Sequence, residues 1–295
     1  MTGTMYESDA QAVIGLFENA AQTLLTSARR SKSIVRLPPR GRLIATGDLH
    51  DNPFHLEKVI AVARLEASPD HHVVMHEMIH GERLLNGMDF SYRMLTRVAE
   101  LVIAHPDQVH PVLANHELAQ MTGRGVSKGA GNSVQLFNDA LDYVFGDDTV
   151  DVADAINGFI RAMPIALLSD GLAGEGGVLC AHSLPMEAMM RHFDIDLFDR
   201  DLTEEDYRAP HGSAYLMVWG RRHSIEQVEQ LAERWGVKLF CLGHEHAETG
   251  IEMRGPRVLI LNTDHERATV LPIDLAAVPT AEEAFIHALP LAAIG

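Results

Sequence analysis

The chain has 295 residues, of which 46% are hydrophobic and 22% charged, a balance that is ordinary for a globular protein with a substantial core and excludes a disordered chain. The formal net charge of −17, without long runs of lysine and arginine, excludes a surface built to neutralise nucleic-acid phosphates. No segment approaches the roughly 20 apolar residues that cross a bilayer, and the N-terminus lacks the pattern of a signal peptide, so we expect no membrane partner and a cytoplasmic location.

The first predicted element is a helix within residues 1–40, which form an N-terminal extension. Its apolar residues recur at helical spacing from a cap at Ser8 or Asp9, and Pro38 and Pro39 prevent its continuation. We expect its apolar stripe to pack on the rest of the protein, and dimerisation through this stripe is the alternative.

Short apolar runs then alternate with amphipathic segments. Strands are predicted in RLIATGDLHD, HHVVMHE and QVHPVLANHE, and helices between them in PFHLEKVIAVARLEA and FSYRMLTRVAELVIAH. Strand, helix, strand, helix, strand is typical of βαβ units. A mostly helical period follows from about residue 118 to 162, and we interpret it as an insertion.

Strands resume in the second half of the chain. PIALLSD and GGVLCAHSLP predict a hairpin across GLAGEG, a helix is predicted from Ser224 to Arg234, and further strands are predicted in VKLFCLGHEH, RVLILNTD and ATVLPIDL. No linker is long or polar enough to separate two domains, so we predict one domain over residues 41–275, followed by a C-terminal tail or helix at 276–295. Cys180 and Cys241 lie inside apolar runs, which favours buried reduced thiols over a disulfide.

Five predicted strands end in residue types that bind metals. Their endings are GDLHD, HEMIH, ANHE, CAHS and GHEH. In open α/β folds, sites assemble outside the carboxyl ends of the strands. Imidazole and carboxylate groups are ligands for zinc, iron or manganese, and a pair of such ions clamps the attacking and leaving oxygens of a phosphoryl displacement. The sequence therefore predicts a metal centre at this edge.

The order and spacing of these endings, from about Leu43 to Leu271, resemble those of the calcineurin-like metallophosphoesterases, whose motifs are DxH, GDxxD, GNHE, a lone His after an apolar strand, and GHxH. The likeness is greatest to the serine/threonine phosphoprotein phosphatase branch, in NHE, AMPIALL, GGVLCAHSLP, MVWGRR and VKLFCLGHEHAETGIE. The resemblance implies an α/β fold, a four-layer αββα sandwich of two mixed β-sheets flanked by helices. Here the sandwich would carry an extra N-terminal helix.

The resemblance also implies two transition-metal ions (manganese, iron or zinc). The implied ligands are Asp48, His50 and His246 for one ion, Asn115, His182 and His244 for the other, and Glu77 as the bridge. His246 departs from the phosphoprotein phosphatase branch, which keeps only the first His of the GHxH pair, whereas the wider family keeps both.

The implied chemistry is attack on phosphorus by a hydroxide that bridges the two metals. His116 is placed to protonate the leaving alkoxide. The predicted catalytic residues are His116, Glu77 and His80. Asn115, with Arg221 or Arg222, is expected to contact the substrate, because a planar guanidinium fits phosphate oxygens. We expect Glu117 to hold the loop in place rather than to take part in catalysis.

The second motif departs from the family pattern, since HEMIHG stands in place of GDxVDRG. The bridging Asp becomes Glu77, and the Asp that would orient the catalytic His becomes His80. The phosphate-holding Arg is replaced by Gly81 or displaced to Arg83. His80 and the neighbouring His76 are also candidates for additional metal ligands.

The sequence therefore predicts a dinuclear metal-dependent phosphatase that acts on phosphate monoesters, in a phosphoprotein or a small phosphorylated metabolite. One alternative is a catalytically weakened, phosphatase-like metal-binding protein that works by interaction. Another is a nucleotide or dinucleoside polyphosphate hydrolase. The oligomeric state is not predicted.

Overall fold

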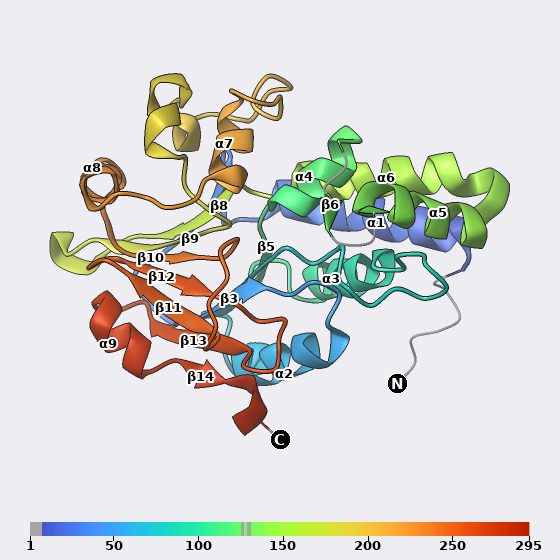
Figure 1. Cartoon of the computed structure of the whole chain (residues 1–295). Helices are drawn as coiled ribbons and strands as arrows, with labels where there is room; N and C mark the ends of the chain where they lie inside the picture. The colour runs from blue at the N-terminus through green and yellow to red at the C-terminus, as the bar shows by residue number, and fades with distance from the viewer. Residues whose placement is uncertain (1–7, 125–126, 129–130, 295) are drawn as a thin grey trace.

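Two β-sheets packed face to face form the centre of the protein, and helices lie on their outer sides (Figure 1). The computed structural model describes residues 8–124, 127–128 and 131–294. Within these ranges the larger sheet has seven strands, in the order β1-β2-β8-β9-β10-β12-β11. Their bounds are β1 (Arg30–Ser31), β2 (Ile34–Leu37), β8 (Ala166–Ser169), β9 (Gly177–Ala181), β10 (Val237–Leu242), β11 (Ile251–Arg254) and β12 (Val258–Leu261).

The smaller sheet has five strands in the described part of the chain, in the order β14-β13-β3-β4-β5. The strands β3, β4 and β5 run parallel to one another, while β13 is antiparallel to both of its neighbours, β14 and β3. Their bounds are β3 (Arg42–Asp48), β4 (His71–His76), β5 (Val109–Pro111), β13 (Thr269–Asp274) and β14 (Leu289–Pro290). A separate pair consists of β6 (Ser127–Lys128) and β7 (Gly131–Asn132).

Both faces of each sheet are covered, and this explains why the strands consist of nearly continuous apolar runs. Leu43 and Ala45 belong to the hydrophobic cluster between the two sheets, whereas Ile44 belongs to the cluster beneath the helices. Leu167 and Leu168 of the other sheet divide in the same way. Successive side chains of a strand point to opposite faces, so one run supplies two cores. The predicted sandwich of two mixed sheets flanked by helices is confirmed.

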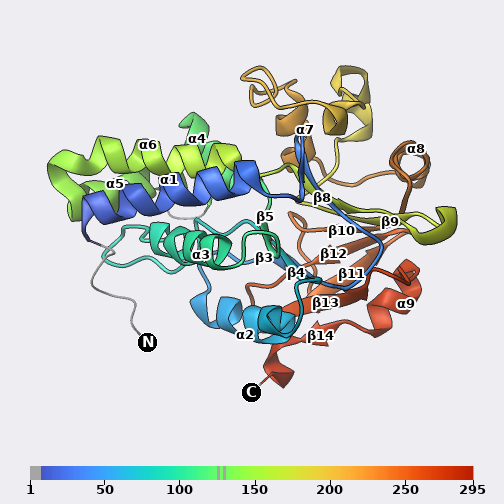
Figure 2. The ribbon, with the colours of Figure 1, turned by 180° about the vertical axis from the view of Figure 1, so that it is seen from behind.

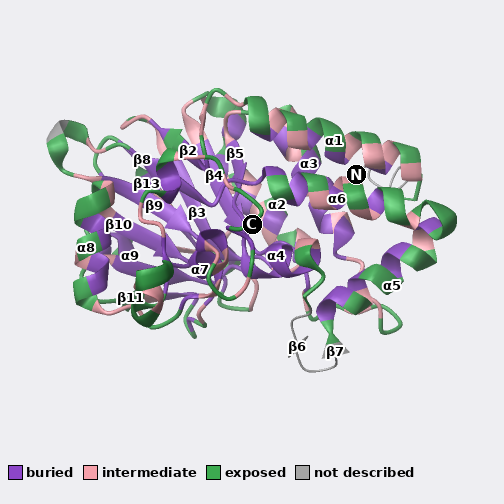
Figure 3. Cartoon of the chain, turned by 90° about the horizontal axis from the view of Figure 1, so that it is seen from above, coloured by how far each residue is buried: buried purple, intermediate pink, exposed green. Residues whose placement is uncertain are grey.

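Helices form the two outer layers. In Figure 2, seen from behind, α1 lies along α6, with α3 beneath it. Figure 3 shows the buried sheets enclosed by helices whose outward faces are exposed. The helices are α1 (Ala10–Thr26), α2 (Pro53–Ala63), α3 (Tyr92–Ala104), α4 (Asn115–Thr122), α5 (Ser133–Phe145), α6 (Thr149–Ala162), α7 (Ser213–Trp219), α8 (Ile225–Trp235) and α9 (Ala281–Ile286). None of them, over the described residues, is long and apolar enough to span a membrane.

The prediction of helix up to the proline pair is wrong beyond Thr26. Asp9 caps α1 as predicted, because its Oδ1 accepts a hydrogen bond from the Ala12 N–H at 3.2 Å. The chain then turns, and Ile34–Leu37 pairs in parallel with β8. β-branched residues favour a strand here because the sheet buries both of their faces, a tertiary effect that local periodicity does not contain.

The C-terminal segment 276–295 contains more than the predicted tail or helix. After α9, which begins with a capping box between Thr280 and Glu283, Leu289–Pro290 adds a short strand to β13. The predicted hairpin of β8 and β9 is confirmed, and both cysteines are buried free thiols as predicted. The strand β11 and the helix α7 were not among the predicted elements.

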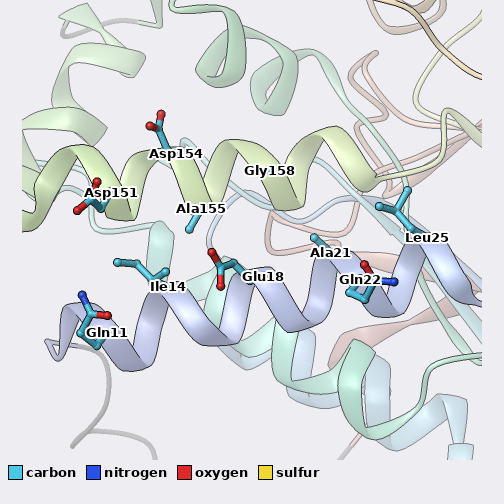
Figure 4. Close-up of a pocket in the computed structure, with 10 residues that line it drawn as sticks. All are labelled: Gln11, Ile14, Glu18, Ala21, Gln22, Leu25, Asp151, Asp154, Ala155 and Gly158. Atoms are coloured by element: carbon cyan, nitrogen blue, oxygen red, sulfur yellow. The ribbon is translucent and has the colours of Figure 1, made fainter.

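A groove of about 590 Å³ runs between α1 and α6 (Figure 4). Its lining combines the acidic Glu18, Asp151 and Asp154 with the apolar Ile14 and Leu25. The groove is lined by residues of two helices and lies away from the strand ends that carry the metal-binding residue types.

Candidate metal centre

The two sheets come into direct contact at the ends of β3 and β12. A Cβ atom on Gly47 would lie 1.8 Å from the Leu261 carbonyl oxygen, so only glycine fits. The next residue, Asp48, bridges to Asn262, and the Asp48 carbonyl accepts a hydrogen bond from the Thr263 N–H at 3.1 Å. This close approach places Asp48 at the junction of the sheets, within reach of side chains from both.

Five polar side chains meet at this junction, each at the end or beginning of a different element. Asp48 ends β3 and His76 ends β4. Asn115 begins α4, directly after the chain leaves β5. His182 follows β9 and His244 follows β10. All five are buried, and they come from segments that the sequence separates by almost 200 positions.

Asn115, His182 and His244 form one side of the centre. The His182 Nε2 atom lies 2.5 Å from Asn115 Oδ1 and 3.1 Å from His244 Nδ1. His244 Nδ1 is also 3.1 Å from Asn115 Oδ1. Glu77 Oε2 completes the set at 3.3 Å from His182 Nε2.

The donor chemistry of this set fits a cation. An amide oxygen and a carboxylate can only accept, and a metal requires imidazole in its neutral form. Burial lowers the pKa of His182 well below its ordinary value, and burial, followed by the nearby Arg221 charge, lowers the pKa of His244 to about 3. Both rings are therefore neutral at pH 7 and offer lone pairs beside the Glu77 carboxylate.

Glu77 also borders a second set of ligand atoms. Its Oε1 lies 3.2 Å from His116 Nε2 and 3.6 Å from His50 Nε2. In the described residues, three groups have the composition and proximity to hold a metal ion: Asp48, His76 and His182; His50, Glu77 and His116; and Glu77, His182 and His244. Glu77 is the carboxylate shared by the last two, so one side chain connects the two halves of the centre.

Asp48 lies beside the same centre but is held by the backbone. Both of its carboxylate oxygens accept from the His244 N–H, at 3.0 and 3.1 Å. Burial acts to raise the pKa of Asp48, but the neighbouring His50 and His76 and these hydrogen bonds outweigh it, so the net shift is downward. A second carboxylate is thus kept in its charged form at the centre.

His246 is the one predicted ligand that is exposed. It lines the same pocket, and its ring lies 5.7 Å from the ring of His265. It belongs to none of the metal-holding groups in the described ranges.

Two further residues organise the HEMIHG loop. The His80 Nδ1 atom is 3.1 Å from His116 Nδ1, so the residue in the position of the orienting Asp does contact the predicted acid. Glu117 Oε1 accepts from the backbone N–H groups of Met78 at 2.7 Å and Ile79 at 3.2 Å. Glu117 therefore holds the loop, in agreement with the structural role predicted for it.

Several residues of the centre hold backbone conformations that only glycine adopts freely. The φ angles are 39° at His50, 52° at Glu77, 58° at His80 and 66° at His244. A positive φ costs side-chain-bearing residues free energy and persists where the surroundings enforce it, most often at functional sites. These turns aim the side chains of successive strand ends into one volume.

A pocket of about 530 Å³ opens over the centre. Arg221 lines it and donates from Nη1 to the His244 carbonyl oxygen at 2.7 Å. Arg222 is exposed and is not among the lining residues; its backbone N–H binds Glu245 Oε1 at 3.0 Å. Arg83 spans the rim from the His50 carbonyl at 2.6 Å to Asp264 Oδ1 at 2.8 Å.

Part of the pocket wall consists of residues that the sequence did not predict as site residues. Asn262, Asp264 and His265 line it from the loop that follows β12, and Trp219 lines it from the end of α7. The signal was present, because LNTDH is another apolar strand that runs into polar residues. It matches none of the family motifs.

The fold and the centre define an α/β sandwich with candidate metal-binding groups at its strand ends. A family model described as calcineurin-like phosphoesterase matches residues 41–248. The chain belongs to this family, because the match covers more than half of its length.

Solved structures with the same fold include two phosphatases. One is a protein serine/threonine phosphatase from Saccharomyces cerevisiae with similarity to human phosphatase PP5, at 13% identity and a TM-score of 0.64, covering 90% of this chain and 82% of that one. The other is a cold-active protein-tyrosine phosphatase of a psychrophile, Shewanella sp., at 12% identity and a TM-score of 0.54, covering 87% and 82%. A search of the curated proteins finds no match. At these identities the likeness to the two structures shows the fold alone.

Proposed function

We propose that this protein is a metal-dependent phosphatase that hydrolyses phosphate monoesters with two ions at the strand-end centre. The observation that carries the proposal is the position of Glu77, whose two carboxylate oxygens face different sets of ligand atoms, His182 on one side and His50 with His116 on the other. A carboxylate shared between two sets of imidazole groups can bridge a pair of cations.

Asn115, His182 and His244 would hold one ion, and Asp48 with His50 the other, with Glu77 shared. His246, exposed in the same pocket, is a further candidate ligand for the ion held by Asp48 and His50. Bound in this set, a pair of manganese, iron or zinc ions lowers the pKa of water and neutralises phosphate charge.

Side chains of the protein would donate the proton and bind the phosphate. His116 Nε2 faces the centre beside Glu77 and is proposed to give a proton to the leaving oxygen. Its Nδ1 atom lies 3.1 Å from His80 Nδ1, a contact that restrains the orientation of the ring. Arg221 reaches the pocket and is proposed to bind phosphate oxygens together with the Asn115 amide.

The general acid indicates the class of substrate. An alkoxide leaves poorly without a proton, whereas a phosphoanhydride or an activated aryl ester does not need one. A buried His116 therefore favours phosphate esters of alcohols, such as phosphoserine or phosphothreonine in a protein or a phosphorylated small metabolite, over nucleotide polyphosphates.

A second candidate is a phosphatase-like metal-binding protein with weak turnover that acts by interaction. It is favoured by His80, because an imidazole ring replaces the carboxylate that would stabilise a protonated His116. Under this candidate the metal centre forms, and hydrolysis stays slow even with both ions bound.

The test begins with protein stripped by a chelator and reloaded separately with Mn²⁺, Fe²⁺ and Zn²⁺. Metal content and phosphate release from p-nitrophenyl phosphate, a phosphoserine peptide and a nucleoside triphosphate are then measured. We expect two ions per chain and hydrolysis of the monoesters. Two bound ions without turnover would support the interaction candidate, and no recruitable metal would refute both.

A further inference from the structure

His76 occupies the position directly before Glu77, where the family motif has glycine. The ring is fully buried at the end of β4. Its Nε2 lies 2.8 Å from the carbonyl oxygen of Thr46 on the neighbouring strand β3. A backbone carbonyl only accepts hydrogen bonds, so Nε2 of His76 carries a hydrogen and donates it.

The other nitrogen of His76 faces His182. The two Nδ1 atoms are 3.2 Å apart, a hydrogen-bond distance that requires one donor and one acceptor. Since the His76 proton is on Nε2, its Nδ1 offers the lone pair and His182 Nδ1 supplies the hydrogen. The neutral His182 ring then has its own lone pair on Nε2, the atom that faces Asn115, His244 and Glu77. An ion bound among these groups would take this lone pair, whereas without an ion Asn115 Oδ1 at 2.5 Å favours a hydrogen on Nε2.

We propose that His76 is a positioning residue that sets the tautomer and the angle of the His182 ring, so that Nε2 is the atom presented to a metal ion. Metal-binding histidines commonly donate their second ring N–H to a carboxylate, a carbonyl or water. Here the acceptor is a second imidazole, and the Thr46 carbonyl determines its state. The proposal deepens the proposed function, on which it rests for the identity of the metal centre.

The local packing is built around this ring. A Cβ atom on Gly243 would lie 2.5 Å from His76 Cε1 and 2.2 Å from Asp48 Oδ1. Glycine at position 243 therefore leaves the space in which His76 meets His182. Asp48 Oδ1 is 3.6 Å from both Nδ1 atoms, too far to be the acceptor for either ring.

The alternative role for His76 is that of a metal ligand. Asp48, His76 and His182 also form one of the groups with the proximity to hold an ion. If they bind a third cation through the two Nδ1 atoms, His76 is a ligand and the hydrogen bond between the rings does not exist. The number of ions per chain distinguishes the two roles.

The first experiment reads the tautomers directly in Zn²⁺-loaded protein, because without an ion Asn115 Oδ1 competes for a hydrogen on His182 Nε2. Nitrogen-15 NMR of histidine-labelled protein distinguishes Nδ1–H from Nε2–H rings, and the His76→Asn and His182→Asn variants assign the two signals. We expect Nε2–H for His76 and Nδ1–H for His182. An Nε2–H signal for His182 would overturn the proposal.

The second experiment measures the affinity for Zn²⁺ of wild type and two variants. His76→Leu removes the acceptor at similar volume and is expected to weaken binding by roughly 10- to 100-fold, the usual effect of losing such a partner. His76→Asn places an amide oxygen where Nδ1 was and is expected to restore most of the affinity. Urea unfolding of both metal-free variants checks that they fold.

The outcomes separate this proposal from the proposed function. Equal affinity of wild type and His76→Leu, or three ions per wild-type chain with two in His76→Leu, would overturn the positioning role. Both readouts are independent of turnover. A chain that binds two ions with the expected tautomers but hydrolyses no phosphate ester would refute the proposed function and leave the role of His76 standing.

Discussion

His80 and His116 face each other through their Nδ1 atoms at 3.1 Å, both buried beneath the pocket. The far nitrogen of His80, Nε2, is 3.2 Å from Gln120 Oε1, and the Gln120 amide nitrogen donates to Asn138 Oδ1 at 2.8 Å. Gln120 Oε1 is thus an acceptor for a hydrogen on His80 Nε2. With its hydrogen on Nε2, the His80 ring offers the lone pair of Nδ1 to His116. His116 is thereby held with Nε2 toward the centre.

Replacing His116 with Asn should separate substrates by their leaving groups. An alkyl phosphate such as phosphoserine needs the proton, and its kcat/KM should fall by about 10²- to 10⁴-fold. The dinitrophenolate group of dinitrophenyl phosphate leaves without a proton, so kcat/KM for this ester should fall far less. Steady-state kinetics with both substrates makes the comparison.

Gln120→Met provides the matched variant for this prediction. It removes the acceptor for the His80 hydrogen without touching the pocket, so we expect a smaller loss with the same preference for the activated ester. Equal losses on both substrates in His116→Asn would contradict the general-acid role.

His244 and His246 belong to one motif and lie in one pocket, yet they differ in burial. His244 Nδ1 is 3.1 Å from both Asn115 Oδ1 and His182 Nε2, whereas His246 is exposed. His244→Ala should lower the metal content by one ion per chain, measured by mass spectrometry after dialysis. His246→Ala should retain both ions, and loss of an ion in this variant would make His246 a ligand.

The two neighbouring arginines should differ in their effect on substrate binding. Arg221 lines the pocket, and Arg222 does not. Arg221→Ala should raise KM for a phosphate monoester by about tenfold, since a charge-assisted hydrogen bond contributes about 1.5 kcal/mol or more. Arg222→Ala should leave KM unchanged. A larger KM increase in Arg222→Ala would reverse the assignment.

Glu77→Gln keeps the shape of the bridging side chain and removes its charge. If Glu77 contacts both ions, affinity should fall by at least about tenfold, because a charged ligand becomes neutral. At a metal concentration of about 100 times the wild-type Kd, binding stabilises wild type by about 2.7 kcal/mol and a tenfold weaker variant by about 1.4 kcal/mol. Urea unfolding with and without metal measures both. Glu82→Gln, on the exposed wall of the same pocket, is the control and should behave as wild type.

A second pair of buried histidines lies away from the centre, near the opposite ends of β4 and β5. His72 Nδ1 is 3.2 Å from His110 Nε2, and both rings are almost fully buried. Burial, followed by the nearby Arg29 charge, lowers the pKa of His72 to about 4, with Asp107 and Asp70 acting in the opposite direction. Burial also lowers the pKa of His110 well below its ordinary value.

This pair predicts loss of stability in mild acid. Unfolded His72 takes up a proton near pH 6.5 and the folded residue only near pH 4, so its contribution is complete above pH 6.5 and is lost as the pH falls toward 4. The difference corresponds to at most about 3 kcal/mol. Urea unfolding between pH 7.5 and 5, with a chelator present, should show a shallower pH dependence in His72→Asn than in wild type. Identical slopes would contradict the prediction.

The sequence by itself determined the fold and the location of the centre. Runs such as RLIATGD and GGVLCA are apolar on both faces, which requires two covered sheets, and polar residues after each run mark one edge. The resemblance of these endings to the family motifs implied that Asn115, His182 and His244 meet, and the structure brings them within hydrogen-bonding distance.

Only the tertiary structure decided which side chains enter the centre and through which atoms. His246 stands two residues after His244 but remains exposed at the pocket, and Ile34–Leu37 leaves the helical pattern to pair with β8. His76 meets His182 because two sheets approach each other across Gly243, and the Thr46 carbonyl then determines which nitrogen carries the hydrogen. Side-chain direction and hydrogen-bond state depend on these non-local contacts, which residue spacing does not encode.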